Sequence, residues 1–554
     1  MAIIFVFYLL LWLIIPKHGF WGMDSGYKYQ GARAFSNTAK LDIPYAGLSF
    51  DPDGSYRPLV PPYGVLQNDR QLPVFSVLFM VSAGILYWMF GSMGPFMLPL
   101  LGGWGSLIAG WFLWVKNRDN HDGRAFLLAL GLGSPLMFYS LTLWEHSLSI
   151  IPVILAMAFV ARRRKDLGAL TIWEPFLSGV LIALATAFRT ESVVWIPALL
   201  ISWRWTGRKL NHILYFIFGL MIAIVVLLFF DKLLTDSFMP LHVASNVNLH
   251  FISSLKLLVI TRFQNFYVLM IEGFDKNFWS VLGVVPLLLV VFWRAWRVKP
   301  RFWWSIFSLL IIIWLIFIAN SMSNQNPVAY TSDSGGLLWI TPFAVMGLMV
   351  ARGEQRQFWW MIWSSSLLFI LLIALASPMV HAVQWGPRLI LQTVPFLLML
   401  ATARAQKWWK KYRPVRPIVI VLIIFSVLNQ LYSVGLLYNK RSESVKLNDW
   451  AVVNNKEVAI TDMPWLNGEL GFVSDTRPSY YAKREDAIRS VVMGLRSQGY
   501  GKFHFFELPP YRDQAFWWKI GAEIMDTNYA VEIGDANAQI RRTTLKIIPG
   551  SATP

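Results

Sequence analysis

Ionisable side chains beside long apolar runs are the residues of this sequence best placed to do chemistry. Asp24 lies in the glycine-flanked stretch 22–27 (GMDSGY), a few residues after the first apolar run. A carboxylate in that position can take a proton from a hydroxyl nucleophile, which is the task of a general base. A turn residue or a helix N-cap is the ordinary alternative. Because charges near membrane depth are costly, we treat Asp24 as a candidate catalytic base.

Glu145 and His146 form a second ionisable pair, in a turn after an apolar segment that opens with Gly-Ser-Pro at 133–135. Carboxylate and imidazole both suit divalent metals. Glu145 is therefore a candidate to bind a metal together with Asp24, or to hold an acceptor, and His146 is a candidate second ligand. A solvated turn at the membrane surface is the alternative for both residues.

Three arginines are candidates to bind phosphate, because a planar guanidinium donates to two phosphate oxygens at once. Arg189 is followed closely by Glu191, with which it could instead form an ion pair. Arg388 is the better candidate, since the Gly-Pro turn before it fixes its direction. Arg57 lies in the first long loop. Arg70, Arg262 and Lys276 lie in other loops and are further candidates.

Membrane-spanning helices are the elements that must position these side chains. The 554 residues are 56% hydrophobic and only 14% charged, whereas about a quarter of an ordinary soluble chain is charged. Apolar runs long enough to span a bilayer recur along the chain. The sequence therefore predicts an α-helical polytopic membrane protein.

The positions of lysine and arginine predict which side each loop faces. Basic clusters favour the cytoplasm, and between consecutive clusters lies enough apolar sequence for two crossings. The turns at 144–146, 189–191 and 378–387, and the loops near 232–278 and 320–334, should then face outward. The basic clusters lie at 116–124, 162–165, 204–209, 294–301, 352–356 and 404–416.

Counting crossings constrains the N-terminal region. The first apolar segment, 2–15, lacks a signal-peptide pattern and is predicted to be a retained helix that leads into a large external loop, 16–94. The apolar stretches 73–92 and 95–115 cannot both cross if the basic loop after them is cytoplasmic. We expect 73–92 to lie along or dip into the outer leaflet, which leaves about thirteen transmembrane helices.

The last crossing is predicted at 417–437. The chain then divides into a transmembrane domain, 1–437, and a small extracytoplasmic C-terminal α/β domain, 438–554. Hydrophobic patterning predicts a helix at 484–497. Strands are expected at 457–461, 502–506, 530–533 and 543–548.

Composition also excludes several classes of protein. The net charge of +18 is concentrated in short loops, so nucleic acid is not an expected partner. The absence of cysteine excludes disulfides and thiolate chemistry. The absence of an Asn-x-Ser/Thr sequon favours a bacterial or archaeal plasma membrane.

In several motifs taken in order, the sequence resembles the GT-C class of integral-membrane glycosyltransferases. A first helix leads to a loop opening with Asp24, and this loop continues through 56–63 (YRPLVPPY) into a semi-hydrophobic stretch. Ser-Pro at 134–135 then precedes an acidic residue at the next external turn, Glu145. Finally, 386–389 (GPRL) leads towards a Pro-Phe-Leu run. With its C-terminal domain the architecture is similar to the aminoarabinose-to-lipid A transferase and protein O-mannosyltransferase branch.

This resemblance implies that Asp24 activates the acceptor for direct, inverting attack on a sugar carried by polyprenyl phosphate. Glu145 would take the second acidic position, which positions substrate or binds metal, and Arg388 would face the lipid phosphate. The chain departs from the pattern where Ser25 follows Asp24 and where Arg57 or Arg70 must replace a lysine. The implied partners are membrane lipids, the lipid-linked sugar and an extracytoplasmic glycolipid, polysaccharide or protein acceptor. A divalent metal ion is the one candidate cofactor.

Two other functions fit parts of the sequence. An O-antigen-type polymerase or ligase would use arginines and a histidine in a large later loop, for which His242, His250 and Arg262 are candidates. A non-enzymatic flippase or transporter of lipid-linked sugar would place charges in mid-membrane and repeat one half in the other. Most charges here lie at the ends of spans, and neither half repeats the other.

Overall fold

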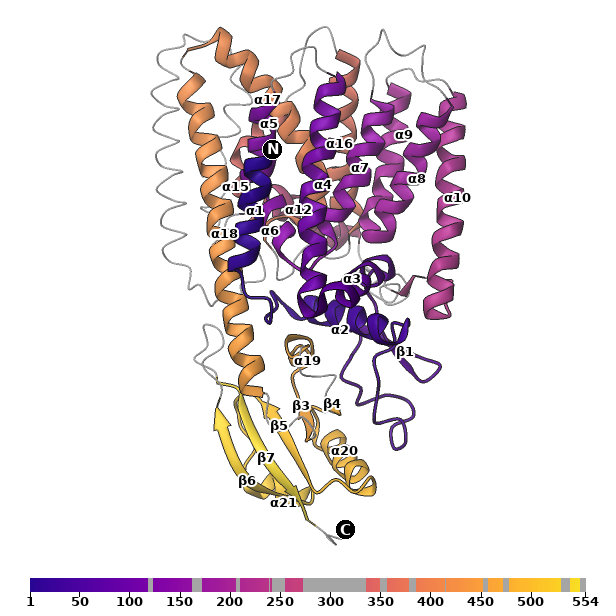
Figure 1. Ribbon diagram of the computed structural model, residues 1–554, viewed down its shortest axis with the longest axis vertical. Helices are drawn as coiled ribbons and strands as arrows, with labels where there is room; N and C mark the ends of the chain where they lie inside the picture. Colours follow the sequence, from indigo (N-terminus) through magenta and orange to yellow (C-terminus); the bar gives the residue numbers. More distant parts are fainter. Residues whose placement is uncertain are drawn as a thin grey trace.

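The computed structural model describes residues 1–117, 123–161, 172–205, 210–238, 240–241, 255–272, 335–348, 356–377, 385–413, 415–451, 457–471, 478–529 and 539–548. The α-helices of its larger part are α1 (Ala2–Ile14), α2 (Met23–Thr38), α3 (Val77–Phe90), α4 (Gly94–Asn117), α5 (Arg124–Leu132), α6 (Leu136–Leu141), α7 (His146–Val160), α8 (Trp173–Phe188), α9 (Trp195–Trp205), α10 (Leu210–Thr235), α12 (Leu255–Met270), α15 (Leu337–Ile340), α16 (Arg356–Ala376), α17 (Val394–Lys411) and α18 (Val415–Ala451). Short 3₁₀ segments are η1 (Gly91–Met93), η3 (Thr190–Val194), η5 (Pro342–Leu348) and η6 (Arg388–Thr393). Most of these helices run side by side (Figure 1).

Several of these helices are suited to cross a membrane. Within the described residues, five helical stretches are long and apolar enough to do so by length and composition: Val77–Lys116, Leu210–Thr235, Gln357–Ala376, Arg388–Lys411 and Val415–Ala451. Shorter apolar helices are Ala2–Ile14, His146–Val160 and Trp173–Phe188. The chain is therefore a multi-pass membrane protein, as expected. The number of about thirteen spans stays a prediction, since residues 273–334 lie outside the described part.

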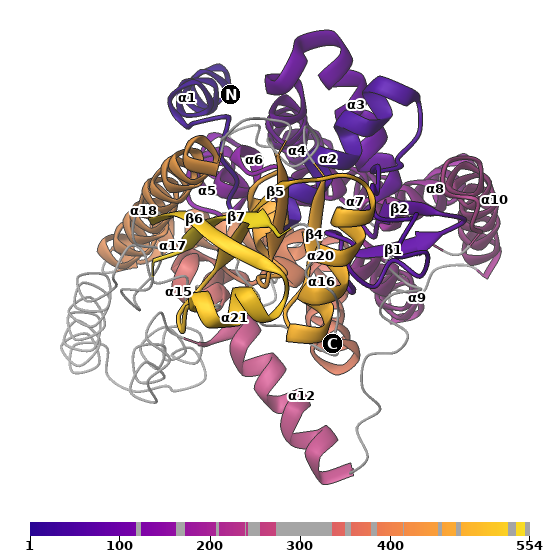
Figure 2. The same cartoon turned by 90° about the horizontal axis from the view of Figure 1, so that it is seen from below.

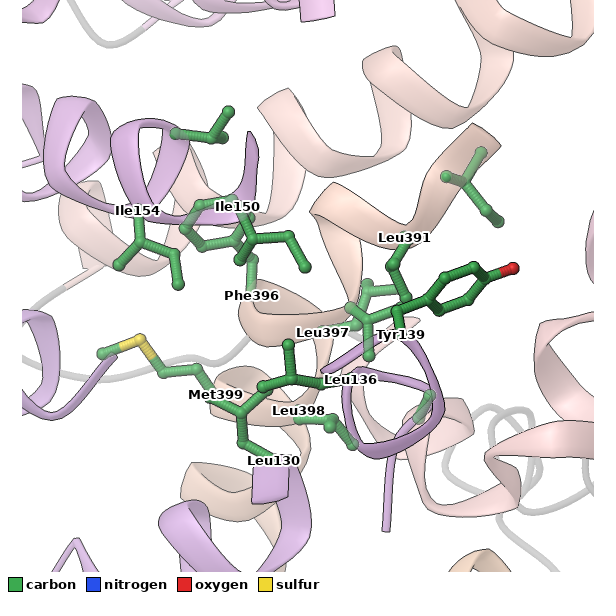
Figure 3. Close-up of a cluster of buried hydrophobic side chains, with 14 of the residues drawn as sticks. Leu130, Leu136, Tyr139, Ile150, Ile154, Leu391, Phe396, Leu397, Leu398 and Met399 are labelled. Atoms are coloured by element: carbon green, nitrogen blue, oxygen red, sulfur yellow. The ribbon is translucent and has the colours of Figure 1, made fainter. Parts of the chain in front are cut away.

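The core of the helical part is built around α17. Its residues from Val394 to Ala405 are all buried, as expected of a helix surrounded by other helices. Figure 3 shows part of this core, where side chains from α5, α6 and α7 meet those of η6 and α17. The labelled members are Leu130, Leu136, Tyr139, Ile150, Ile154, Leu391, Phe396, Leu397, Leu398 and Met399.

The short helices α2 and α3 lie next to each other at the end of the helical part that faces the C-terminal sheet (Figure 1). α3 has 14 residues. It is therefore about 21 Å long, short of the ~30 Å of bilayer hydrocarbon. Since α1, which is expected to cross, has only 13 residues, helix length does not test the expectation that 73–92 lies along the outer leaflet, and it stays a prediction. The hairpin of β1 (Gly64–Gln67) and β2 (Arg70–Pro73) precedes α3 and turns at Asn68 and Asp69, both with positive φ.

Helix α18 runs unbroken from the helical part towards the C-terminal sheet (Figure 1). Its 37 residues make it about 55 Å long, well beyond the thickness of the hydrocarbon. The boundary expected at 437–438 falls inside this helix. The first strand of the sheet begins only at Val458.

The C-terminal sheet has five strands in the order β4-β3-β5-β7-β6. β3 is parallel to β4 and β5, whereas β7 is antiparallel to β5 and β6. Helix α20, expected from its apolar spacing, packs Ile488, Val491 and Leu495 onto this sheet. The elements are β3 (Val458–Thr461), α19 (Leu466–Glu469), β4 (Ser479–Tyr481), α20 (Glu485–Ser497), β5 (Lys502–Glu507), α21 (Gln514–Lys519), β6 (Ala522–Tyr529) and β7 (Arg541–Ile547).

The strands expected at 457–461, 502–506 and 543–548 are present as β3, β5 and β7, but β4 and β6 were missed. The strand expected at 530–533 lies outside the described residues.

The first loop and the C-terminal part hold α2 between them. In α2, a Cβ on Gly26 would lie 1.6 Å from the carbonyl oxygen of Gly468, so the two backbones touch. The Tyr27 hydroxyl donates to the carbonyls of Pro58 (3.3 Å) and Pro464 (3.0 Å). Seen from below, the sheet and α20 lie across this end of the molecule (Figure 2). Residues far apart in sequence thus fix the position of one short helix.

Candidate active site

Asp24 lies in the first turn of α2 and is half-buried. The positive end of the helix dipole favours an ionised carboxylate at this position. Among the described residues, no hydrogen bond or ion pair engages the Asp24 carboxylate. Its electrostatic neighbours are Tyr27, Lys28 and Tyr63. Asp24 is thus an available carboxylate next to a cation and two phenols.

Four charged side chains near Asp24, alternating in sign, form a series of ion pairs. Lys28 Nζ lies 2.7 Å from Glu145 Oε2, and Arg189 Nη1 lies 2.7 Å from Glu145 Oε1. Arg189 also reaches Glu191 Oε1 through Nε, at 2.7 Å. The ion pair between Arg189 and Glu191, considered from the sequence as an alternative to phosphate binding, therefore exists. It is part of a network joining α2, α7 and the turn after α8.

Glu145 is held in its ionised form by these two cations. Burial raises the pKa of its carboxyl group, but Lys28 and Arg189 outweigh burial and lower it to about 2. Both carboxylate oxygens face a cation, which leaves little room for a metal ion. No group of three or more metal-ligating side chains occurs in the part of the chain that the structure describes. Metal binding by Asp24 and Glu145 stays a prediction without a geometric signal.

His146 adjoins Glu145 and lies among aromatic rings. Its ring stacks on Tyr139 at 4.6 Å between centroids and lies 5.3 Å from Trp144. Neither ring nitrogen has a hydrogen-bond partner among the described residues. Arg189, Lys28 and Arg388 are the charged groups that act on it. His146 therefore belongs to the same cluster, but it faces cations rather than metal-ligating carboxylates.

Arg388 reaches the cluster from the start of η6. Gly386 adopts a positive φ of 65° in the turn before it, and Tyr139 fixes this turn by donating to the carbonyl of Trp385 (2.9 Å). The guanidinium lies 5.9 Å from the ring centroid of Trp144. Its buried Nε has no hydrogen-bond partner among the described residues. Arg388 is therefore a cation without a carboxylate partner in the described structure, as a phosphate ligand should be.

Tyr63 connects the base candidate with the phosphate candidate. The tyrosine is half-buried and its ring stacks on Tyr27, with 5.9 Å between centroids. Burial raises the pKa of its hydroxyl, Asp24 raises it further, and Arg388 opposes both. Asp24 and Arg388 thus both act electrostatically on the Tyr63 hydroxyl, which relates the two candidates to the same tyrosine.

The remaining sequence candidates lie elsewhere. Arg57 donates to the carbonyls of Leu59 (3.1 Å) and Gly54 (2.9 Å) and so closes its own loop. Arg70 forms ion pairs with Asp42 (3.4 Å) and Asp236 (3.1 Å). Arg262, on α12, donates to the carbonyl of Ser377. His242, His250 and Lys276 lie outside the described residues.

Lys28 and Tyr63 are the members of the cluster that sequence reasoning missed. Lys28 follows Asp24 by four residues, which places both on one face of a helix. That spacing was the available signal. This spacing is informative only if residues 23–38 form a helix, whereas the sequence predicts an external loop over 16–94. Nothing in the sequence singled out Tyr63.

Solved structures to which this chain is similar include two GT-C membrane glycosyltransferases. One is ArnT from Cupriavidus metallidurans bound to undecaprenyl phosphate, at 11% identity and a TM-score of 0.46, covering 100% of this chain and 99% of that chain. Another is the Archaeoglobus fulgidus oligosaccharyltransferase in its apo form, at 10% identity and a TM-score of 0.47, covering 91% and 69%. No protein-family model and no curated protein matches the sequence. Since both TM-scores are below 0.5, the function proposed below rests on this chain's own residues.

Proposed function

We propose that this chain is a membrane glycosyltransferase that moves a sugar from a polyprenyl-phosphate donor to a hydroxyl acceptor outside the cytoplasm. The acceptor would be a glycolipid, polysaccharide or protein of the cell envelope. The observation that carries the proposal is that, among the described residues, Asp24 has no ion-pair partner and the buried Arg388 Nε has no hydrogen-bond partner, while both side chains act electrostatically on Tyr63. An available carboxylate and an available guanidinium at one place match a reaction that removes a proton and leaves a phosphate.

The proposed reaction is a single displacement with inversion at the anomeric carbon. Asp24 accepts the proton of the acceptor hydroxyl, while the oxygen of that hydroxyl forms a bond to the anomeric carbon. The bond from the anomeric carbon to the phosphate oxygen breaks, and its electron pair stays on the phosphate. Arg388 stabilises the charge that develops there. The products are the glycoside and polyprenyl phosphate, with the proton on Asp24.

The ion-pair network around Glu145 supports the proposed role of Arg388. Lys28, Glu145, Arg189 and Glu191 neutralise one another in pairs, so they do not compete with Arg388 for an incoming phosphate. If the topology expected from the basic loops holds, the α2 end of the molecule is outside. The C-terminal sheet, which packs on α2, would then be outside as well.

The test is transfer of radiolabelled sugar from the polyprenyl-linked pool into envelope material, in membranes that contain matched amounts of each variant. We expect Asp24→Asn to reduce transfer by about 10²- to 10⁴-fold, because the general base is lost. Arg388→Gln should reduce it by about 10²- to 10³-fold.

Asp53→Asn and Arg413→Gln alter exposed residues of the same types and should transfer normally. Undiminished transfer by a folded Asp24→Asn protein would refute the proposed base and with it the proposed reaction. The anomeric configuration of the product, measured by NMR, should be opposite to that of the donor. Retention would exclude a single displacement.

A further inference from the structure

Lys28 is a buried cation whose surroundings leave it no access to substrate. Its side chain is 2% exposed, and its ammonium lies 2.7 Å from Glu145 Oε2. The ammonium also lies over the rings of Phe75 (4.9 Å) and Trp144 (5.5 Å), at distances at which cation–π attraction acts. A donor phosphate cannot reach a group enclosed in this way. Lys28 is therefore unsuited to bind the donor, although it is close to the proposed base.

The ion pair of Lys28 with Glu145 connects two elements far apart in sequence. Lys28 lies one helical turn after Asp24 on α2, and Glu145 precedes the first residue of α7. Glu145 is itself held by Arg189, at 2.7 Å, from the turn after α8. The pair thus fixes the rotation of α2 about its own axis, which sets the direction of the Asp24 side chain.

Stability alone is a poor explanation for this pair. Burying two charges costs free energy that their attraction recovers only in part, and apolar replacements of buried pairs are often no less stable. Lys28 also attracts Asp24 electrostatically, from one helical turn further along α2. The fixed rotation of α2 and the attraction by Lys28 both act on the Asp24 carboxylate.

We propose that Lys28, anchored by Glu145, is the positioning residue that directs Asp24 towards the acceptor hydroxyl. The proposal rests on the function proposed above. It differs from that function in its consequences, because it concerns how Asp24 is held and not whether Asp24 reacts.

The test compares Lys28→Met with Lys40→Met, a change at an exposed lysine just after the end of α2. The kcat of Lys28→Met for sugar transfer should fall by about 10²-fold, the loss typical of a displaced catalytic group. The KM for the lipid-linked donor should stay close to that of the wild type. A merely structural role would not lower kcat in a folded protein while leaving the donor KM unchanged.

Lys28→Arg is the second variant, in case Lys28→Met does not fold. It keeps the charge but not the shape, so its kcat should fall less than that of Lys28→Met, again at an unchanged donor KM. A wild-type kcat in a folded Lys28→Met protein would overturn the inference. So would an increase in donor KM at constant kcat, which would show donor binding. Full transfer by Asp24→Asn would instead refute the proposed function itself, so the two failures are distinguishable.

Discussion

Replacing Glu145 by glutamine should destabilise the protein far more than replacing an exposed carboxylate. The side chain would keep its shape, but Lys28 and Arg189 would lose the charge that each approaches to 2.7 Å. Leaving one member of a buried pair uncompensated costs about 3–5 kcal/mol. The pKa of Glu145 supports a similar magnitude. Its depression from 4.5 to about 2 corresponds to about 3 kcal/mol of stability.

The same depression predicts how stability depends on pH. A carboxyl group whose pKa is lower in the folded state contributes stability that is fully present above its unfolded pKa. For Glu145 that contribution should be constant above pH 4.5 and disappear as the pH falls towards about 2. The difference in the free energy of unfolding between the wild type and Glu145→Gln should become smaller over the same pH interval.

The assay is unfolding in detergent by increasing SDS, followed through the fluorescence of the 28 tryptophans. Glu523→Gln changes an exposed carboxylate and is the control. The double variant Lys28→Met/Glu145→Gln should be more stable than Glu145→Gln alone, because the uncompensated ammonium is removed as well. If Glu145→Gln unfolds at the wild-type SDS concentration, the buried network is not an energetic unit and the reasoning is refuted.

Two further changes test the contacts that hold α2 and the C-terminal sheet. Gly26→Ala would place a methyl group 1.6 Å from the Gly468 carbonyl oxygen, so it should separate α2 from α19 and lower sugar transfer. The control is Gly435→Ala, where nothing lies within 4 Å of the added methyl group, and it should leave transfer unchanged. Normal transfer by Gly26→Ala would show that this close approach does not matter for activity. Trp517→Ala should cost about 3–5 kcal/mol in the SDS assay, because Trp517 is fully buried in the core of the C-terminal sheet. Trp518→Ala, at a side chain that is 60% exposed, should change stability by no more than about 0.5 kcal/mol, and equal losses for both would contradict the packing.

Local patterns in the sequence were sufficient for much of the fold. Apolar runs indicated membrane helices, since a helix of such composition is stable only in lipid or in a core. The spacing of Ile488, Val491 and Leu495 indicated the amphipathic helix α20. The requirement that basic loops share one side predicted that 73–92 lies along the outer leaflet, and this stays a prediction. By contrast, the helix α2 was missed, because its residues 23–38 show no strong apolar face.

By itself the sequence determined that this protein is a multi-pass membrane protein, and it identified several ionisable residues as candidates for the site. It could do so because hydrophobicity, charge and spacing are properties of local sequence. Only the tertiary structure decided which candidates act together. It brought Asp24, Glu145, His146, Arg189 and Arg388 into one cluster and left Arg57 in its own loop. It also gave Glu145 two cations as partners, one of them the overlooked Lys28. These relations depend on contacts between helices up to hundreds of residues apart, and distances of that kind are fixed by packing and not by any local pattern.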